Sequence, residues 1–138
     1  MLGVTTLEEE TVNPFQGPAI PLLSAVTIDC ADPSALGRFW AELLGVEISH
    51  ESEQWVFLAH APDRKVTLWF QRVPEPKVGK NRVHVDFGVL NLEAAEDRVV
   101  ELGGRLGERH TWQRFEWRIC FDPEGNEFDL ALVVQDAA

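Results

Sequence analysis

The sequence predicts an α+β fold in which two βαβββ modules in tandem form curved mixed sheets around a central cavity. The first observation is an internal repeat: Ala25–Gly45 aligns without a gap with His84–Gly104, so that Val26 falls opposite Val85. The second is the pattern inside each copy, where an apolar strand leads into a capped helix that a glycine ends. The third is that three more strand-like segments follow each copy. Because a chance match would not keep one register over the whole stretch, we interpret the chain as two modules.

The strand and helix of the second copy have the clearest pattern. In Arg82–Val89, valine and phenylalanine alternate with polar residues and a glycine, which is the period-two pattern of a half-buried strand. Asn91 is a suitable N-cap for the helix that follows, and Gly103 with Gly104 ends that helix.

The first copy repeats this layout. Leu22–Cys30 is the expected strand, Asp32 the expected N-cap, and Pro33 takes the first helical position. Gly45 ends the helix. Apolar residues recur at helical spacing in both helices, so we expect one buried face on each. The side chains expected in the core are Leu36, Phe39, Trp40, Leu43, Val99 and Leu102.

The remaining segments complete each module. We expect strands at Val46–His50, Gln54–His60 and Val66–Val73 in the first module, and at Arg105–Thr111, Phe115–Phe121 and Glu127–Val134 in the second. The predicted organisation is an N-terminal arm at residues 1–21, a first module at 22–73, a linker at 74–81, a second module at 82–134 and a tail at 135–138.

Composition and charge exclude several classes of function. The 138 residues are 45% hydrophobic and 25% charged, which is ample for a packed core. The net charge of −11 argues against a nucleic-acid partner, because phosphate binding needs a basic surface. No apolar run is long enough to span a membrane, and no leader precedes the first module, so we expect a cytoplasmic protein. Cys30 and Cys120 are expected to be reduced, buried thiols rather than a disulfide.

Three motifs together resemble one known superfamily. They are FWAELLG at Phe39–Gly45, HVD at His84–Asp86 and DPEGNEFDL at Asp122–Leu130. With the internal repeat, they resemble the vicinal oxygen chelate superfamily, which includes glyoxalases, bleomycin-resistance proteins and extradiol dioxygenases, and within it the glyoxalase-like domain group. The resemblance covers Leu22–Val134 and is specific for fold rather than for reaction, because this superfamily hosts many chemistries.

The resemblance also implies where a metal would bind. Family members use two ligands from each module, and the second-module positions match His84 and Asp129. The first-module positions match Ala25, which cannot ligate, and the strand Val66–Val73, where Gln71 is the least poor donor. The family's complete site is therefore not expected. The sequence requires no cofactor, and a divalent ion (Zn, Ni, Mn or Fe) held by His84 and Asp129 is one alternative.

Strand alternation predicts the side chains that face the cavity. We expect His84 and Asp129 to be catalytic, as an acid–base pair. Residues expected to bind the ligand are Thr27, Asp29, Thr67, Trp69, Gln71, Asp86, Trp117 and Glu127. The alternatives are a hydrogen-bonded pocket histidine, a solvated groove wall for the carboxylates, and ordinary sheet packing for each tryptophan. Such a pocket suits a neutral or cationic ring compound better than a phosphate.

Two functions follow from these residues. The first is a glyoxalase-like lyase or isomerase acting on a small organic molecule. The second is a non-catalytic protein of the same fold that sequesters a compound such as an antibiotic; a regulatory module with a vestigial pocket is a third alternative. Open sheet edges, which proteins usually cover, further predict a homodimer in which the arm at Phe15–Leu23 takes part.

Overall fold

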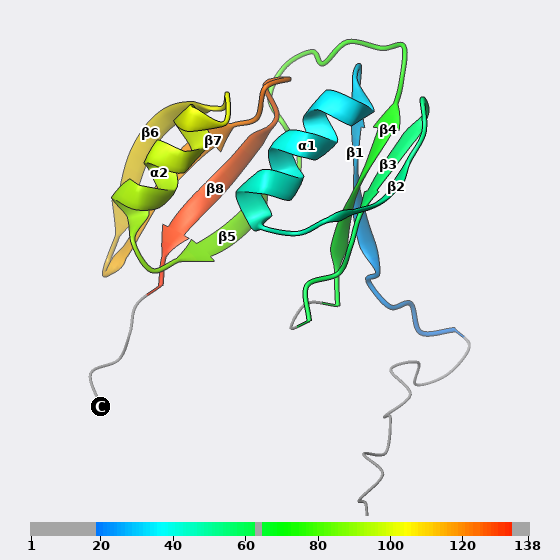
Figure 1. Ribbon diagram of the computed structural model, residues 1–138. Coiled ribbons are helices and arrows are strands. Elements are labelled where there is room, and N and C mark those ends of the chain that lie inside the picture. Colours follow the sequence, from blue (N-terminus) through cyan, green and yellow to red (C-terminus); the bar gives the residue numbers. More distant parts are fainter. Residues whose placement is uncertain (1–18, 63–64, 134–138) are drawn as a thin grey trace, which may run out of the picture.

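Two four-stranded mixed sheets, each with one helix, form the structure (Figure 1). It is a computed structural model and describes residues 19–62 and 65–133. The first sheet contains β1 (Ala25–Cys30), β2 (Ile48–Glu51), β3 (Trp55–Leu58) and β4 (Thr67–Arg72), in the order β1-β4-β3-β2, and its helix is α1 (Pro33–Leu44). The second contains β5 (Val85–Val89), β6 (Arg105–Trp112), β7 (Phe115–Phe121) and β8 (Glu127–Leu132), in the order β5-β8-β7-β6, and its helix is α2 (Leu92–Glu101).

The shared strand order confirms the predicted tandem of βαβββ modules. β1 pairs with β4, and β5 with β8, in parallel, whereas the other neighbours are antiparallel. The strands before each helix are shorter than predicted, since they begin at Ala25 and Val85. Leu23 and Val83, which precede them, are exposed. The boundaries of arm, linker and tail remain predictions, and most of the arm and all of the tail lie outside the described residues.

The helix caps are as the sequence predicts. The Asp32 side chain accepts a hydrogen bond from the backbone N–H of Ala35, and Pro33 stands in the first turn of α1. Asn91 accepts in the same way from the N–H of Ala94. Gly45 follows α1 with a φ of 66°, in the left-handed region that glycine adopts without strain.

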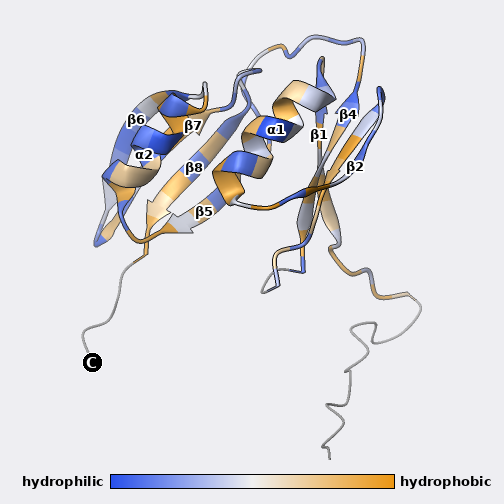
Figure 2. Cartoon of the chain, in the orientation of Figure 1, coloured by the Kyte–Doolittle hydropathy of each residue, from blue (hydrophilic) through white to orange (hydrophobic). Residues whose placement is uncertain are grey.

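The core lies between the helices and the sheets, and Trp40 is at its centre. α1 lies between the two sheets (Figure 1), so Trp40 contacts the second module as well as its own. Its ring centroid lies 4.6 Å from that of Phe128 and 5.6 Å from that of Phe87. Figure 2 shows hydrophilic and hydrophobic residues mixed along each helix, as expected for helices with one buried face. Of the predicted core residues, Leu36, Phe39, Trp40 and Val99 are buried, and Leu43 and Leu102 are partly buried.

The turn between β7 and β8 joins the second module to the start of α1. The Asp122 carboxylate accepts from the N–H groups of Glu124 and Asn126, which shapes the turn. The Glu124 carboxylate then accepts from the N–H groups of Ala31 (2.6 Å) and Asp32 (3.1 Å). One side chain therefore satisfies two backbone donors of the other module.

Removing this carboxylate should weaken the junction between the modules. We expect Glu124→Ala to lower the free energy of unfolding by about 1–2 kcal/mol, because two charge-assisted hydrogen bonds are lost at a partly exposed site. Denaturant unfolding measures the change, with Glu101→Ala, a substitution at an exposed position of α2, as the control. Equal stabilities of the two variants would show that the bridge contributes nothing.

Both cysteines are free and buried, as predicted. Burial raises the pKa of the Cys30 thiol to about 12, and nearby carboxylates such as Glu124 add to the effect. Burial likewise raises the pKa of Cys120 to about 12. Neither thiol is therefore ionised near neutral pH, and neither is a candidate nucleophile. Among the described residues, no helix is long and apolar enough to cross a membrane.

Candidate functional site

One histidine and two aspartates meet on the face of the second sheet that points away from α2. In β5 and β8 the apolar side chains of Phe87, Phe128 and Leu130 belong to the core, so the residues between them point to the other face. We call this the outer face. The strand register pairs Asp86 directly with Asp129, and His84 immediately precedes β5.

The ring of His84 lies within ion-pair distance of both carboxylates. Nδ1 of His84 is 3.2 Å from Oδ1 of Asp86 and 3.6 Å from Oδ2 of Asp129. One potential ligand atom from each residue falls within 4.8 Å of the other two. This His–Asp–Asp cluster is the candidate site.

Asp129 is the least exposed member of the cluster. Its side chain is 13% exposed, against 43% for His84 and 63% for Asp86. Burial raises the pKa of Asp129, and a hydrogen bond that protonated Asp129 donates to the neighbouring Asp86 carboxylate raises it further, although the charge of His84 acts in the opposite direction. Asp129 therefore holds a proton more readily than an aspartate in water, which suits a group that donates a proton.

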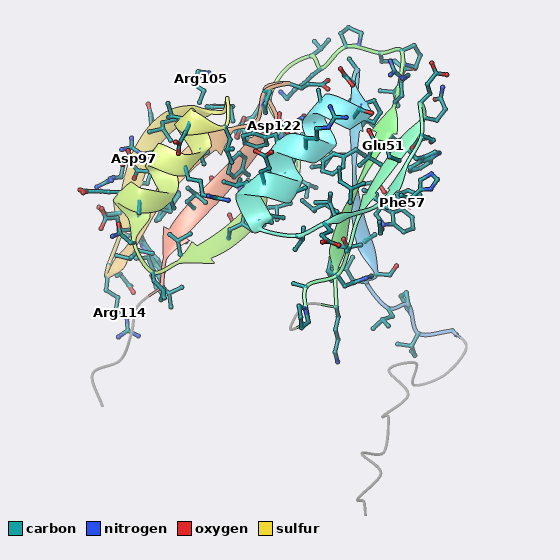
Figure 3. All side chains as sticks on the ribbon, viewed as in Figure 1. Glu51, Phe57, Asp97, Arg105, Arg114 and Asp122 are labelled. Carbon is teal, nitrogen blue, oxygen red and sulfur yellow. The ribbon has the colours of Figure 1, made fainter. Side chains whose placement is uncertain are left out.

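A pocket of about 480 Å³ adjoins the cluster. Its other walls come from the end of the β6–β7 hairpin, beside Arg114 in Figure 3. The rings of Trp112 and Phe115 are stacked there, with centroids 6.0 Å apart and planes inclined by 13°. The lining residues are His84, Asp86, Trp112, Phe115, Glu116, Trp117, Asp129, Ala131 and Leu132.

Four of the predicted site residues line this pocket, namely His84, Asp86, Trp117 and Asp129. Glu127 does not line it: its carboxylate binds Nζ of Lys80 at 2.6 Å, and this bond lowers its pKa.

The first-module residues predicted to complete the cavity do not line the pocket beside His84, although Thr67 and Asp86 together line another pocket, of about 380 Å³, between the two modules. Trp69 is on the outer face of the first sheet, where its ring centroid is 4.3 Å from that of Phe57. The hydroxyl of Thr67 is buried and donates to the carbonyl of Leu58. Thr27 and Gln71 are on the first sheet, and Asp29 lines a different pocket, beside Cys30 and Glu124. Every residue that lines the pocket beside His84 belongs to the second module.

Five pocket residues were not among the predicted site residues: Trp112, Phe115, Glu116, Ala131 and Leu132. Strand alternation within β7 could have predicted Phe115, because it is two residues from Trp117 and therefore shares its face of the sheet. Trp112 could not be assigned in the same way, since its position depends on which residue of β6 pairs with Phe115.

The donor set of the cluster fits a divalent cation. One imidazole nitrogen and two carboxylates suit Zn²⁺, Mn²⁺, Fe²⁺ or Ni²⁺. The two further ligands that the superfamily takes from the first module are not in reach, because Ala25 has no donor atom and Gln71 does not line the pocket. Among the described residues, the group that could hold a metal ion comes from the second module.

Comparison with protein-family models shows to which family the chain belongs. A family model described as the glyoxalase-like domain matches residues 25–131, which includes both sheets and both helices up to Ala131 in the last strand. The chain belongs to the glyoxalase-like domain family. No curated protein matches this glyoxalase-like chain.

Solved structures agree with this family on the fold. A glyoxalase/bleomycin resistance protein/dioxygenase family enzyme from Burkholderia phytofirmans PsJN has a TM-score of 0.69 at 19% identity, over 80% of this glyoxalase-like chain and 98% of that one. The fosfomycin resistance protein FosX from Listeria monocytogenes has a TM-score of 0.68 at 14% identity, over 83% and 95%. A lactoylglutathione lyase from Agrobacterium tumefaciens has a TM-score of 0.60 at 17% identity, over 84% and 96%. At these identities the likeness extends to the fold alone.

Proposed function

We propose that this glyoxalase-like chain is an enzyme of lyase or isomerase type that moves a proton on a small organic molecule. His84 and Asp129 are the proposed catalytic pair, and Asp86 and Trp117 contact the substrate. The observation behind the proposal is the His–Asp–Asp cluster, whose bonding atoms lie within 4.8 Å of one another beside an aromatic pocket. Proton transfer is a reaction step that lyases and isomerases share.

The proposed roles follow from the distances. A carboxylate 3.2 Å from Nδ1 of His84 can accept a hydrogen bond from its N–H, and in this tautomer of the neutral ring Nε2 has a lone pair. A neutral imidazole held in this way is a base, while Asp129, with its raised pKa, can return a proton to the product. The aromatic walls would exclude water from one side of the substrate.

A bound metal would use the same residues. His84, Asp86 and Asp129 would hold the ion, and it would act as a Lewis acid that polarises an oxygen of the substrate. The three side chains would then fix the ion and the position of the substrate against it, and the aromatic walls would orient the rest of the molecule.

A non-catalytic binding protein is the second candidate. The observation that favours it is that Ala25 has no side-chain donor atom and Gln71 does not line the pocket, so the first module supplies neither of the two ligands that the superfamily takes from it. The same pocket would then sequester a compound without changing it.

Hydrogen exchange distinguishes the two candidates without a known product. We expect wild-type protein in D₂O to incorporate deuterium at carbon in at least one member of a panel of 2-oxo and 2-hydroxy compounds, measured by NMR. Replacing the base in His84→Ala should slow this exchange about 10²–10⁴-fold. His50→Ala, on the first sheet, is the matched control and should leave the rate unchanged.

Metal analysis of both variants accompanies the exchange assay. Stoichiometric metal that disappears in His84→Ala supports the metal-assisted version. Exchange that continues at the wild-type rate in His84→Ala would exclude His84 as the base, and binding without exchange would favour sequestration.

We also propose a cytoplasmic homodimer. β1 and β2 are the edges of the first sheet, and β5 and β6 those of the second, so partners could cover them. Ile20, Leu22 and Leu23 expose apolar side chains next to β1. We expect light scattering at micromolar concentration to give twice the chain mass, and the mass of one chain would contradict the proposal.

A further inference from the structure

The charged groups of the pocket are unbalanced. Its lining includes Asp86 and Asp129, whose carboxylates are on the outer face, and no lysine or arginine. Glu116 also lines the pocket, but its carboxylate lies 3.0 Å from Nη1 of Arg109, which also binds Glu96 of α2. The only basic side chain in the lining that contacts Asp86 and Asp129 is His84. An anionic ligand would therefore face the carboxylate of Asp86 and the carboxyl group of Asp129, with no lysine or arginine in the lining to offset them.

The opposite wall is aromatic and exposed. Trp112 is 61% exposed and Phe115 45% exposed, although both are large apolar side chains. The strand register sets Trp117 opposite Ala131, two residues from Asp129, and Trp112 opposite Phe115. All three rings are thus outside the core, on the same side of the sheet as the aspartates. They lie where a ligand could contact them.

These two walls together favour one class of ligand. The face of an aromatic ring is electron-rich and attracts an ammonium group within about 6 Å of its centroid. We propose that the pocket binds an organic cation that bears a flat ring, with its charged nitrogen between the two aspartates and the rings of the β6–β7 hairpin. This inference rests on the proposed function, because it names the charge class of the molecule on which that site would act.

The aromatic wall separates this ligand from a metal ion. Both cations would bind Asp86 and Asp129, but a hydrated metal ion gains little from a tryptophan face, whereas an ammonium group with an attached ring contacts both walls. The overall charge of −11 would also raise the local concentration of cations around the protein.

Titration calorimetry with three probes tests the inference. Benzylammonium, benzyl alcohol and phenylacetate share a ring and a size but differ in charge. At pH 7 we expect benzylammonium to bind about 10-fold more tightly than benzyl alcohol, and phenylacetate more weakly than either. Trp112→Ala and Asp86→Asn should each weaken benzylammonium about 5- to 10-fold. Trp69→Ala, on the first sheet, is the matched control and should have no effect.

Each other outcome overturns the inference. Tighter binding of phenylacetate, with or without added Zn²⁺, would show an anion site and leave the proposed function standing. Equal affinities for benzyl alcohol and benzylammonium would show that the positive charge does not contribute to binding. If none of the three probes binds, the pocket does not bind ring-bearing cations. The exchange assay on His84→Ala then tests the proposed function separately. Melting temperatures check that the exposed Trp112 can be replaced without unfolding.

Discussion

Replacing Trp40 with alanine is expected to lower the free energy of unfolding by about 3–5 kcal/mol, the largest effect of any single change considered for this protein. The side chain is 1% exposed and packs against Phe39, Phe87 and Phe128, so its removal would leave a cavity at the contact between the two modules. Its Nε1–H also donates to Asp122, labelled in Figure 3, at 3.1 Å. Denaturant unfolding at constant pH measures the loss.

Two further variants divide the effect into its causes. Trp40→Phe keeps most of the packing but removes the hydrogen bond to Asp122, so it should lose less stability than the alanine variant. Trp112→Ala makes the same chemical change at a side chain that is 61% exposed, and should cost no more than about 0.5 kcal/mol. If Trp40→Ala and Trp112→Ala unfold at the same denaturant concentration, α1 does not join the modules as described.

Glu96→Gln is expected to produce the second-largest loss, about 2–3 kcal/mol. Glu96 is buried on α2, and its carboxylate binds Arg109 at 2.6 Å and Arg118 at 3.1 Å. Glu96→Gln leaves the Arg118 guanidinium without an anionic partner, whereas Arg109 keeps Glu116 at 3.0 Å. Breaking a fully buried ion pair costs about 3–5 kcal/mol. The expected loss is smaller here because the Arg109 side chain is 34% exposed. Asp97→Asn, at an exposed position of α2 (Figure 3), is the control.

The contribution of Glu96 should depend on pH in one direction. Burial alone would raise the pKa of this carboxyl, but the hydrogen bonds and charges of Arg109 and Arg118 outweigh burial and lower it. The folded state therefore favours the ionised form, and the stabilisation is present above the usual glutamate pKa of about 4.3. It is lost as the pH falls through the lowered pKa of the folded protein. The stability difference between wild type and Glu96→Gln should shrink in that range, and a difference that grows there would contradict the assignment.

The fold was predictable because the internal repeat and the caps are local signals. Asp32, Pro33 and Asn91 act within one turn of the chain, and their positions fix where α1 and α2 begin. Strand alternation likewise predicted that His84, Asp86 and Asp129 share a face, since the side-chain period in a strand does not depend on the partner.

The other wall of the pocket was not predictable in the same way. The position of the first sheet relative to the second depends on how Trp40 packs against Phe87 and Phe128, which are remote in sequence. Alternation predicted that Trp69 faces the central cavity, but it could not say which pocket that face of the strand would line. The aromatic wall is formed instead by Trp112 and Phe115, whose pairing across the β6–β7 hairpin is a tertiary property.

An NMR titration that follows the indole N–H signals of the five tryptophans tests directly whether the outer face of the second sheet is the binding site. Each signal is assigned by replacing one tryptophan at a time with phenylalanine, and cationic, neutral and anionic ring compounds are added in turn. If the outer face of the second sheet is the binding site, compounds that bind will shift the signals of Trp112 and Trp117 and leave those of Trp55 and Trp69 unchanged. Shifts confined to Trp55 and Trp69 would place the binding site on the first sheet, which would contradict a site on the outer face of the second sheet.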